Sequence, residues 1–296
     1  MLTLSDRIEL SSLDTYDNLL DFLVSIGYSK NQIKKYLSKG ELKKKIARKM
    51  LLQIPINLIN SFSVNPGYDG PAIEIVYEDE HFVVMNKPKL IHSHPLSYLE
   101  KNNCLSFLLS KGYHLKQTNA YDSTLLHRLD FETSGCLVLA KKYDEYLKMR
   151  ENFNQITKEK IYLAIVEGEF THKGHFICKL ATKGENNSKV FVSDSGQEVK
   201  ASFECLEYSR EKNLSLVKVY LETGHRHQLR VQLAFMGNPI LGDTFYGGKA
   251  SSRLFLHSLS YQVVWENQTY RFVSKNAELF DSFFDLNRCL KMFNDI

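Results

Sequence analysis

The chain has 296 residues, of which 43% are hydrophobic, 24% are charged and 12% are aromatic, and its formal net charge is +4. This composition is ordinary for a globular protein, and the length suffices for one large domain or for a large domain with a small one. No stretch approaches the roughly 20 apolar residues that cross a bilayer, and residues 1–12 lack the basic and apolar regions of a signal peptide. We therefore expect a cytoplasmic protein that does not associate with membranes.

The cysteines and histidines form neither a disulfide framework nor a metal site. The five cysteines are odd in number and widely spaced, without a C-x-x-C pair, which favours reduced thiols. The close histidine pairs, His92 with His94 and His225 with His227, lack an H-E-x-x-H motif or matching cysteines. The glycine patterns of dinucleotide-binding and phosphate-binding loops are also missing from the sequence. We expect neither a metal nor a cofactor.

Basic residues are concentrated near the N-terminus. Segment 30–49 holds nine Lys and Arg residues against Glu41 alone, a charge of +8, so the rest of the chain carries 4 − 8 = −4. Such a distribution is typical of a module that binds a polyanion. The alternative is a solvated, charged helix face.

The N-terminal elements come first in chain order. Tyr16, Leu19, Leu20 and Leu23 follow a helical period, and residues 13–40 predict two short helices. A capping-box pattern at residues 29–32 begins the second helix, and Gly40 is expected to end it. The second half of segment 51–70 is rich in Pro and Gly and predicts a linker. We therefore expect a small module over residues 1–65 and a large domain over residues 71–296.

Strands dominate the large domain. Residues 72–88 predict two strands around a Glu-Asp-Glu turn, and residues 135–141 predict a buried strand before a helix at 143–155. Further strands are expected at 160–170, 189–194, 198–209, 214–222, 254–265 and 269–274, with a helix at 225–236 and a helical tail. Consecutive strands joined by short turns predict an α+β fold with a mostly antiparallel sheet and flanking helices.

The segment LLHRLDFETSG (125–135) places Asp130 in an apolar neighbourhood. A carboxylate that forms an ion pair with an Arg is the ordinary explanation. A glycosidase pair with Glu132 fits poorly, because two residues that close point the same way in an extended segment. A nucleophile must be ionised and partly desolvated, and a nearby Arg serves both needs. The residues alone leave these readings open.

HRLDFETSG (127–135) resembles the signature of the RluA-type pseudouridine synthases, whose Asp is catalytic. Four other segments resemble further blocks of that family in the same order: YEDEHFVVMNKP (77–88), KIYLAIVEGEF (160–170), LETGHRHQLRVQLAFMGNPILGDTFYGG (221–248) and LFLHS (254–258). The resemblance implies the pseudouridine synthase fold with a central RNA-binding cleft. It also implies an isomerase that cuts the N1–C1′ bond of uridine and joins C5 to C1′.

The resemblance assigns roles to residues of this chain. Asp130 is the expected catalytic carboxylate, and whether it attacks the ribose or abstracts a proton stays open. Arg230, three residues after His227 on the expected helix, is the expected partner that keeps Asp130 charged. Tyr162 is expected to stack on the flipped uracil and to assist proton transfer from C5. The residues expected to bind the RNA here are Arg128, Lys87, Lys160, Arg226 and His227.

The sequence also departs from the family pattern. Leu90 stands where a Gly is usual, so the loop is expected to turn differently, and His225 replaces an Arg whose place Arg226 is expected to take. Residues 28–42 resemble the basic helix of the S-four-type RNA-binding domain, with Lys34 and Lys35 as expected RNA contacts, but the strand that usually follows is replaced. A basic helical extension without its own fold is the alternative for this module.

Together these features predict a monomeric RNA pseudouridine synthase. Its expected partner is structured RNA, with ribosomal RNA favoured over transfer RNA because of the basic N-terminal module. The alternative is a catalytically silent RNA-binding or ribosome-assembly protein that keeps the fold.

Overall fold

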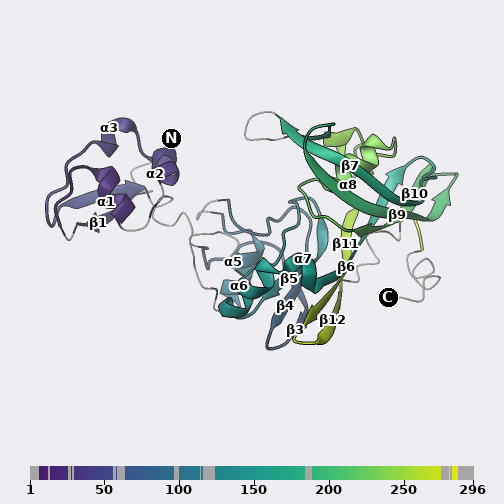
Figure 1. Ribbon diagram of the computed structural model, residues 1–296, viewed down its shortest axis with the longest axis horizontal. Helices are drawn as coiled ribbons and strands as arrows, with labels where there is room; N and C mark the ends of the chain where they lie inside the picture. Colours follow the sequence, from purple (N-terminus) through teal and green to yellow (C-terminus); the bar gives the residue numbers. More distant parts are fainter. Residues whose placement is uncertain are drawn as a thin grey trace. The chain divides into compact units, whose positions relative to one another are not determined.

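The computed structural model describes residues 7–12, 14–25, 28, 30–55, 58, 64–96, 100–113, 115, 124–183, 189–274, 280 and 282–285. The chain forms two compact units, whose elements are labelled in Figure 1. The first unit comprises Met1–Gly70 and His94–Ser123, and the second comprises Pro71–Ser93 and Thr124–Ile296. The sequence did not indicate that the chain returns to the first unit at His94. Among the described helices, none is long and apolar enough to cross a membrane.

The first unit contains a two-stranded antiparallel sheet, β1 (Arg7–Ser11) with β2 (Leu51–Pro55). Two predicted helices are confirmed as α1 (Leu19–Ser25) and α2 (Lys30–Tyr36). Buried aliphatic and aromatic side chains from these elements form one cluster, which includes Phe22, Leu23, Ile33, Leu52 and Ile54. The unit also contains α5 (Cys104–Ser110), which the sequence did not predict and which Asn103 caps by accepting the Ser106 amide at 2.9 Å.

The prediction that Gly40 ends a helix is wrong. Gly40 lies inside a short helix, α3 (Lys39–Leu42), which begins after Ser38. The Ser38 hydroxyl accepts the amide of Glu41, and the Glu41 carboxylate accepts the amide of Ser38 at 2.8 Å. This capping box satisfies the first amides of α3, so the chain restarts a helix at this point. Ser29, on which the other predicted capping box depends, lies outside the described residues.

The second unit is built on a mixed sheet with the order β3-β4-β5-β11-β6-β10-β9-β7-β8, in which β12 also pairs with β11. Every pairing is antiparallel except that of β5 with β11, which confirms the predicted α+β fold. The strands are β3 (Glu74–Glu78), β4 (Phe82–Lys87), β5 (Ser134–Ala140), β6 (Thr157–Glu167), β7 (Gly174–Lys183), β8 (Lys189–Val192), β9 (Gln197–Ser209), β10 (Leu214–Leu221), β11 (Leu256–Trp265) and β12 (Gln268–Val273). The sequence analysis missed β7, where no continuous buried run marks the strand.

Gly135 makes the parallel pairing of β5 with β11 possible. It has a φ of +115°, and a Cβ at this position would lie 2.2 Å from the carbonyl oxygen of Ser258, its partner on β11. Any other residue would clash with backbone that cannot move aside. Gly135 therefore allows the close contact between β5 and β11.

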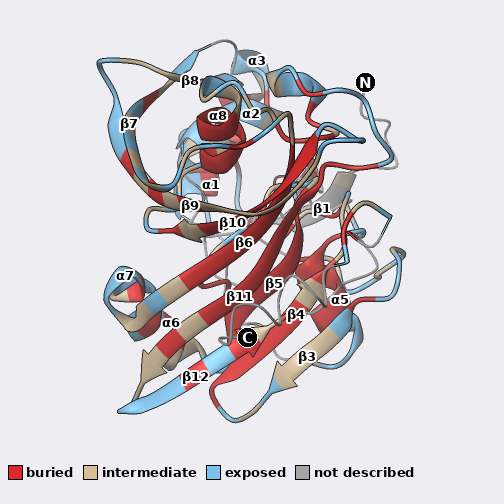
Figure 2. Ribbon diagram, turned by 90° about the vertical axis from the view of Figure 1, so that its right-hand side faces the viewer, coloured by how far each residue is buried: buried red, intermediate tan, exposed pale blue. Residues whose placement is uncertain are grey.

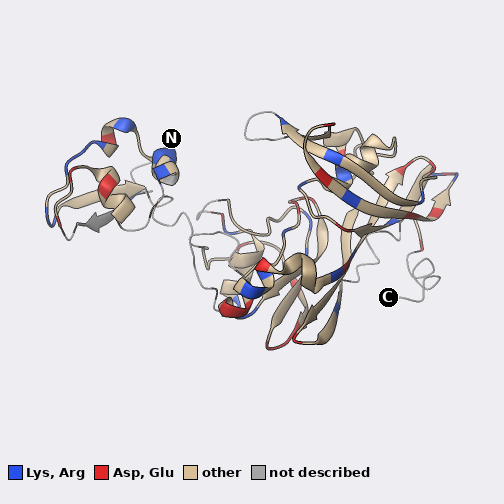
Figure 3. Cartoon of the chain, in the orientation of Figure 1, with Lys and Arg blue, Asp and Glu red and all other residues tan. Residues whose placement is uncertain are grey.

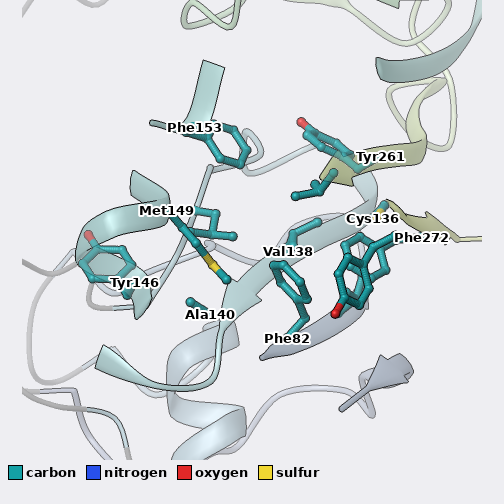
Figure 4. Packing of buried hydrophobic residues seen from close by; sticks show 13 residues of the cluster. Phe82, Cys136, Val138, Ala140, Tyr146, Met149, Phe153, Tyr261 and Phe272 are labelled. Carbon is teal, nitrogen blue, oxygen red and sulfur yellow. The ribbon is translucent and has the colours of Figure 1, made fainter. Parts of the chain in front are cut away.

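Helices cover different parts of the sheet. The predicted helix at 143–155 is two helices, α6 (Tyr143–Glu151) and α7 (Phe153–Ile156), and these pack on β5, β6 and β11. Their buried side chains join those of the central strands in the core that Figure 4 shows. The helix predicted at 225–236 is α8 (Gln228–Phe235), which packs on β7, β8 and the 3₁₀ helix η3 (Thr244–Tyr246). Figure 2 shows that the central strands are the most buried part of the sheet.

Candidate active site

The segment that carries Asp130 immediately precedes β5 and is tied to the loop after β4. Lys87, at the end of β4, is fully buried, and its Nζ donates to the carbonyl oxygens of Ile91 at 2.6 Å, Pro88 at 2.9 Å and Phe131 at 3.3 Å. The Ser93 hydroxyl bonds both the carbonyl and the amide of Leu129 at 3.0 Å. Because these contacts lie on both sides of Asp130, its backbone position is fixed.

Lys87 was expected to line the RNA groove, and its position corrects that expectation. Its ammonium group is enclosed by backbone carbonyls, so it holds two loops together instead of facing solvent. Lys160 is also buried; its Nζ donates to the Glu222 carbonyl at 3.1 Å, and burial lowers its pKa. Arg128 and Arg226 are exposed, as RNA contacts must be. Lys34 and Lys35 are exposed on α2 of the first unit.

The Asp130 carboxyl group is partly buried and accepts no hydrogen bond from any described residue. Burial raises its pKa above the ordinary value, against the attraction of Arg230, while the neighbouring Glu132 raises it further. A carboxylate without donors is poorly solvated and therefore reactive when it is ionised. This setting is unlike that of a structural ion pair, in which both partners are hydrogen-bonded.

Arg230 acts on Asp130 through its charge, because its donors are engaged elsewhere. Its Nε and Nη2 donate to the two carboxylate oxygens of Asp243 at 2.8 and 2.7 Å, and its Nη1 reaches Glu132 at 3.3 Å. Both side chains of the Arg230–Asp243 pair are almost fully buried. The prediction that Arg230 pairs directly with Asp130 therefore needs correction. Asp243 lies in one of the segments that resemble the family, but sequence spacing does not show which cation it binds.

His227 precedes α8 and is connected to Arg230 through Tyr246. Its Nδ1 lies 2.8 Å from the Tyr246 hydroxyl, and the Arg230 guanidinium lies over the Tyr246 ring, 5.3 Å from its centroid. Burial, with the charges of Arg230 and Arg226, lowers the pKa of His227 to about 4. His227 is therefore neutral near pH 7, so the RNA contact expected of it would not rest on a positive charge of its own.

Tyr162, in the middle of β6, is backed by Tyr261 and His127. The Tyr162 and Tyr261 hydroxyl oxygens are 3.0 Å apart, and the Tyr261 oxygen lies 3.2 Å from His127 Nδ1. The Val138 amide donates to His127 Nε2 at 3.1 Å. Burial lowers the pKa of His127 to about 3, so the ring is neutral. Its proton must then be on Nδ1, because Nε2 is the acceptor.

The direction of the hydrogen bond between the two tyrosines follows. A protonated Nδ1 cannot accept a proton from Tyr261, so the Tyr261 hydroxyl donates to the oxygen of Tyr162. Burial raises the pKa of Tyr162 to about 12, although this donation from Tyr261 lowers it. Tyr162 is therefore neutral near pH 7, and the hydrogen bond from Tyr261 offsets part of the cost that burial adds to its ionised form. Sequence reasoning found Tyr162 but missed Tyr261, which carries no motif of its own.

Leu90 follows the Lys87 anchor in the loop after β4. It has a φ of +58°, the left-handed conformation that favours glycine. The expectation that Leu90 makes this loop turn differently is not supported, because its backbone adopts a conformation that a glycine would favour. The departure from the family pattern instead places an exposed leucine side chain on the turn.

The sequence of this chain matches a family of known proteins. A profile of the RNA pseudouridylate synthase family matches residues 81–235, more than half of the chain, including Asp130, Tyr162 and Arg230. The chain belongs to this family. The match does not reach Asp243, Tyr246 or Tyr261.

Some curated relatives in this family have names that refer to the large ribosomal subunit. The chain is 35% identical over 178 residues to the ribosomal large subunit pseudouridine synthase D of Pseudomonas aeruginosa, covering 60% of this chain and 54% of the relative. It is 33% identical over 207 residues to an uncharacterized RNA pseudouridine synthase of Bacillus subtilis, covering 68% of this chain and 67% of the relative. The chain thus spans between half and two thirds of the length of these relatives.

A solved structure shares the fold. The human RNA pseudouridylate synthase domain containing 1 superposes with a TM-score of 0.60 at 18% identity, over 76% of this chain and 96% of that protein. This similarity supports the fold of the pseudouridylate synthase family for the chain.

Replacing Asp130 with Asn is expected to stabilise the fold at neutral pH, because the amide needs no desolvated charge. The folded-state pKa of Asp130 is raised, so the stability that its protonated form contributes is lost as the pH rises through that pKa. Urea unfolding curves of the two proteins should therefore separate near neutral pH and converge as the pH falls. Asp194→Asn, at an exposed position, is the control and should show a difference that changes little with pH. An Asp130→Asn protein no more stable than wild type at neutral pH would contradict the desolvated carboxylate.

Proposed function

We propose that the chain is an RNA pseudouridine synthase that converts uridines in structured RNA to pseudouridine, with Asp130 as the catalytic carboxylate. The observation that carries this proposal is the setting of the Asp130 carboxyl group. It is partly buried, it accepts no hydrogen bond from the described residues, and the charge of Arg230 lowers its pKa against the effect of burial. Ribosomal RNA is the proposed substrate over transfer RNA, in keeping with the name of the P. aeruginosa relative.

The reaction breaks the N1–C1′ bond of uridine, and the base rotates before C5 bonds to C1′. C5 gives up its proton and N1 gains one, so the reaction consumes no oxidant or reductant. Asp130 acts in its ionised form, either on the ribose carbon or on a ribose proton. Arg230 favours that ionised form by its positive charge, and its pairing with Asp243 keeps the guanidinium in place.

Tyr162 is proposed to take the C5 proton in its ionised form, because a phenolate oxygen accepts a proton and ends as a neutral hydroxyl. The hydrogen bond that Tyr261 donates stabilises the negative charge of that phenolate. His127 has a positioning role, because its protonated Nδ1 directs the Tyr261 hydrogen toward Tyr162. The target uracil must leave its helix to reach these groups.

The first unit is proposed to bind RNA as a module resembling the S-four type. All nine Lys and Arg residues of segment 30–49 are exposed, and Figure 3 marks Lys and Arg positions in blue along α2 and near α3. The single acidic residue of the segment, Glu41, caps α3 and pairs with Arg7 at 3.0 Å. Its charge is thus used within the fold, and the exposed face stays strongly positive.

Measuring turnover distinguishes the proposed enzyme from the alternative, an RNA-binding protein without catalytic activity. RNA labelled with tritium at uridine C5 should release tritium to water when incubated with the chain, and sequencing the product should map the pseudouridine. Asp130→Asn should bind the same RNA with similar affinity but release no more tritium than RNA alone, because the amide is neither a nucleophile nor a base. Wild-type activity should fall as the pH is lowered through the raised pKa of Asp130. RNA binding without release from any cellular RNA pool would favour the silent protein.

Tyr261→Phe tests the hydrogen bond behind Tyr162. We expect kcat to fall by roughly 10- to 100-fold, the range for a hydrogen bond to a charged group, with KM nearly unchanged. The same substitution in a Tyr162→Phe protein should change kcat little, since the oxygen that receives the bond is already gone. Equal losses in both backgrounds would show that Tyr261 acts by packing alone.

The double variant Lys34→Gln, Lys35→Gln tests the first unit. If each lysine contacts a phosphate, the slope of log affinity against log salt should become shallower by about 1 per contact. The kcat at saturating RNA should not change. Lys148→Gln is the control, because this exposed lysine on α6 lies near Asp144 and Glu151 in the sequence. An unchanged slope in the double variant would argue against RNA binding by α2.

A further inference from the structure

Two exposed apolar side chains lie on the loops that Lys87 ties together. Phe131, directly after Asp130, is 38% exposed, and Leu90 is 51% exposed. Lys87 Nζ donates to the Phe131 carbonyl and to the carbonyls of Pro88 and Ile91 on either side of Leu90. Two apolar groups are thus held at the surface on loops joined by Lys87, and one of them, Phe131, follows Asp130 directly in the sequence.

Leu90 gains nothing for folding from its position. A left-handed backbone conformation is unfavourable for a non-glycine residue, and the exposed side chain recovers little of that cost by burial. A strained residue near a reactive group is a reason to look for a function.

Phe131 has one ring face supported and another side exposed. The His92 ring lies against it with a centroid distance of 4.6 Å and an interplanar angle of 37°. His92 follows the Leu90 turn by two residues, so the same loop carries the support and the strained leucine. An aromatic ring backed in this way is a firm surface for a nucleobase, and every base can stack on such a ring.

The reaction creates a need for such a surface. A uridine that leaves a stem leaves a gap between its neighbouring bases, and unstacking costs a few kcal/mol. Proteins that distort helices place apolar side chains between base steps. A wedge is most effective next to the pocket that receives the base, and Phe131 is adjacent in sequence to Asp130.

We propose that Phe131 and Leu90 form an apolar wedge that enters the RNA stem at the target and stacks on the bases that flank the flipped uridine. This proposal rests on the proposed pseudouridine synthase activity and adds a role that the chemistry does not require. The wedge lowers the cost of extrusion, so it matters only when the uridine is stacked and paired beforehand.

The test uses two synthetic RNA stems that carry the uridine mapped for the wild-type protein, labelled with tritium at C5. In one stem the uridine is paired with adenosine, and in the other it faces an abasic nucleotide. Phe131→Ala should lower kcat/KM on the paired stem by about 5- to 100-fold, the range that loss of one stacking contact gives. On the abasic stem its activity should stay close to that of wild type.

Matched variants complete the design. Phe131→Trp keeps a stacking surface and should restore activity on the paired stem, which also guards against misfolding of the alanine variant. Phe235→Ala removes a phenylalanine that is 61% exposed at the end of α8 and should leave both stems unaffected. Leu90→Gly should lose activity on the paired stem alone while its melting temperature rises, because glycine relieves the left-handed strain.

The outcomes are distinct from those of the proposed function. If wild type releases no tritium from either stem or from cellular RNA, the synthase proposal fails. If wild type is active and Phe131→Ala lowers kcat/KM equally on both stems, Phe131 belongs to the uracil pocket and the wedge is refuted. If Phe131→Ala lowers kcat/KM on neither stem, the wedge is also refuted. If Phe131→Ala lowers kcat/KM on the paired stem and Leu90→Gly does not, Leu90 has no part in the wedge.

Discussion

The buried pair between Arg230 and Asp243 is the constraint around which the site is arranged. Two hydrogen bonds of 2.7 and 2.8 Å fix the guanidinium plane, and the Tyr246 ring lies beneath it. Burying an arginine is unfavourable unless its charge is compensated, and Asp243 provides that compensation. The remaining contact, to Glu132, reaches the segment that carries Asp130. The position of α8 and the position of the loop that carries Asp130 are therefore linked through one side chain.

The same arrangement explains why the pKa of Asp130 is raised in spite of a nearby arginine. Arg230 interacts with three carboxyl groups. It forms ion pairs with Asp243 and Glu132, and it acts on Asp130 only by longer-range electrostatic attraction. Burial then outweighs the attraction at Asp130. A direct bidentate pair would have kept Asp130 ionised but would have occupied the oxygens that the proposed reaction uses. The pairing with Asp243 leaves those oxygens free of hydrogen-bond donors among the described residues.

Much of this could be predicted from the sequence, and two of the corrections share a cause. Strands and the type of fold followed from alternating and continuous apolar runs, and the motif around Asp130 indicated the candidate site. The family resemblance assigned Lys87 to the RNA groove and made Arg230 the partner of Asp130. Neither assignment takes account of burial or of competing partners. Burial and side-chain partners depend on distant segments of the chain. The Phe131 carbonyl accepts a hydrogen bond from the buried Lys87, and Asp243, not Asp130, forms the close ion pair with Arg230. The prediction that a helix ends at Gly40 failed for a different, local reason, because the capping box at Ser38 starts a new helix there.

Both unfavourable features of the second unit lie on the loops that Lys87 joins. Asp130 carries a charge that the fold does not solvate, and Leu90 holds a backbone conformation that suits glycine. The side chains of Phe131 and Leu90 add little packing against these costs, because both are exposed. The stability must come from the central strands, whose side chains are almost all buried, and from the hydrogen bonds of Lys87 and Ser93 that transmit it to the loops. A rigid sheet thus lets two loops keep features that do not favour folding, as is expected at a functional site.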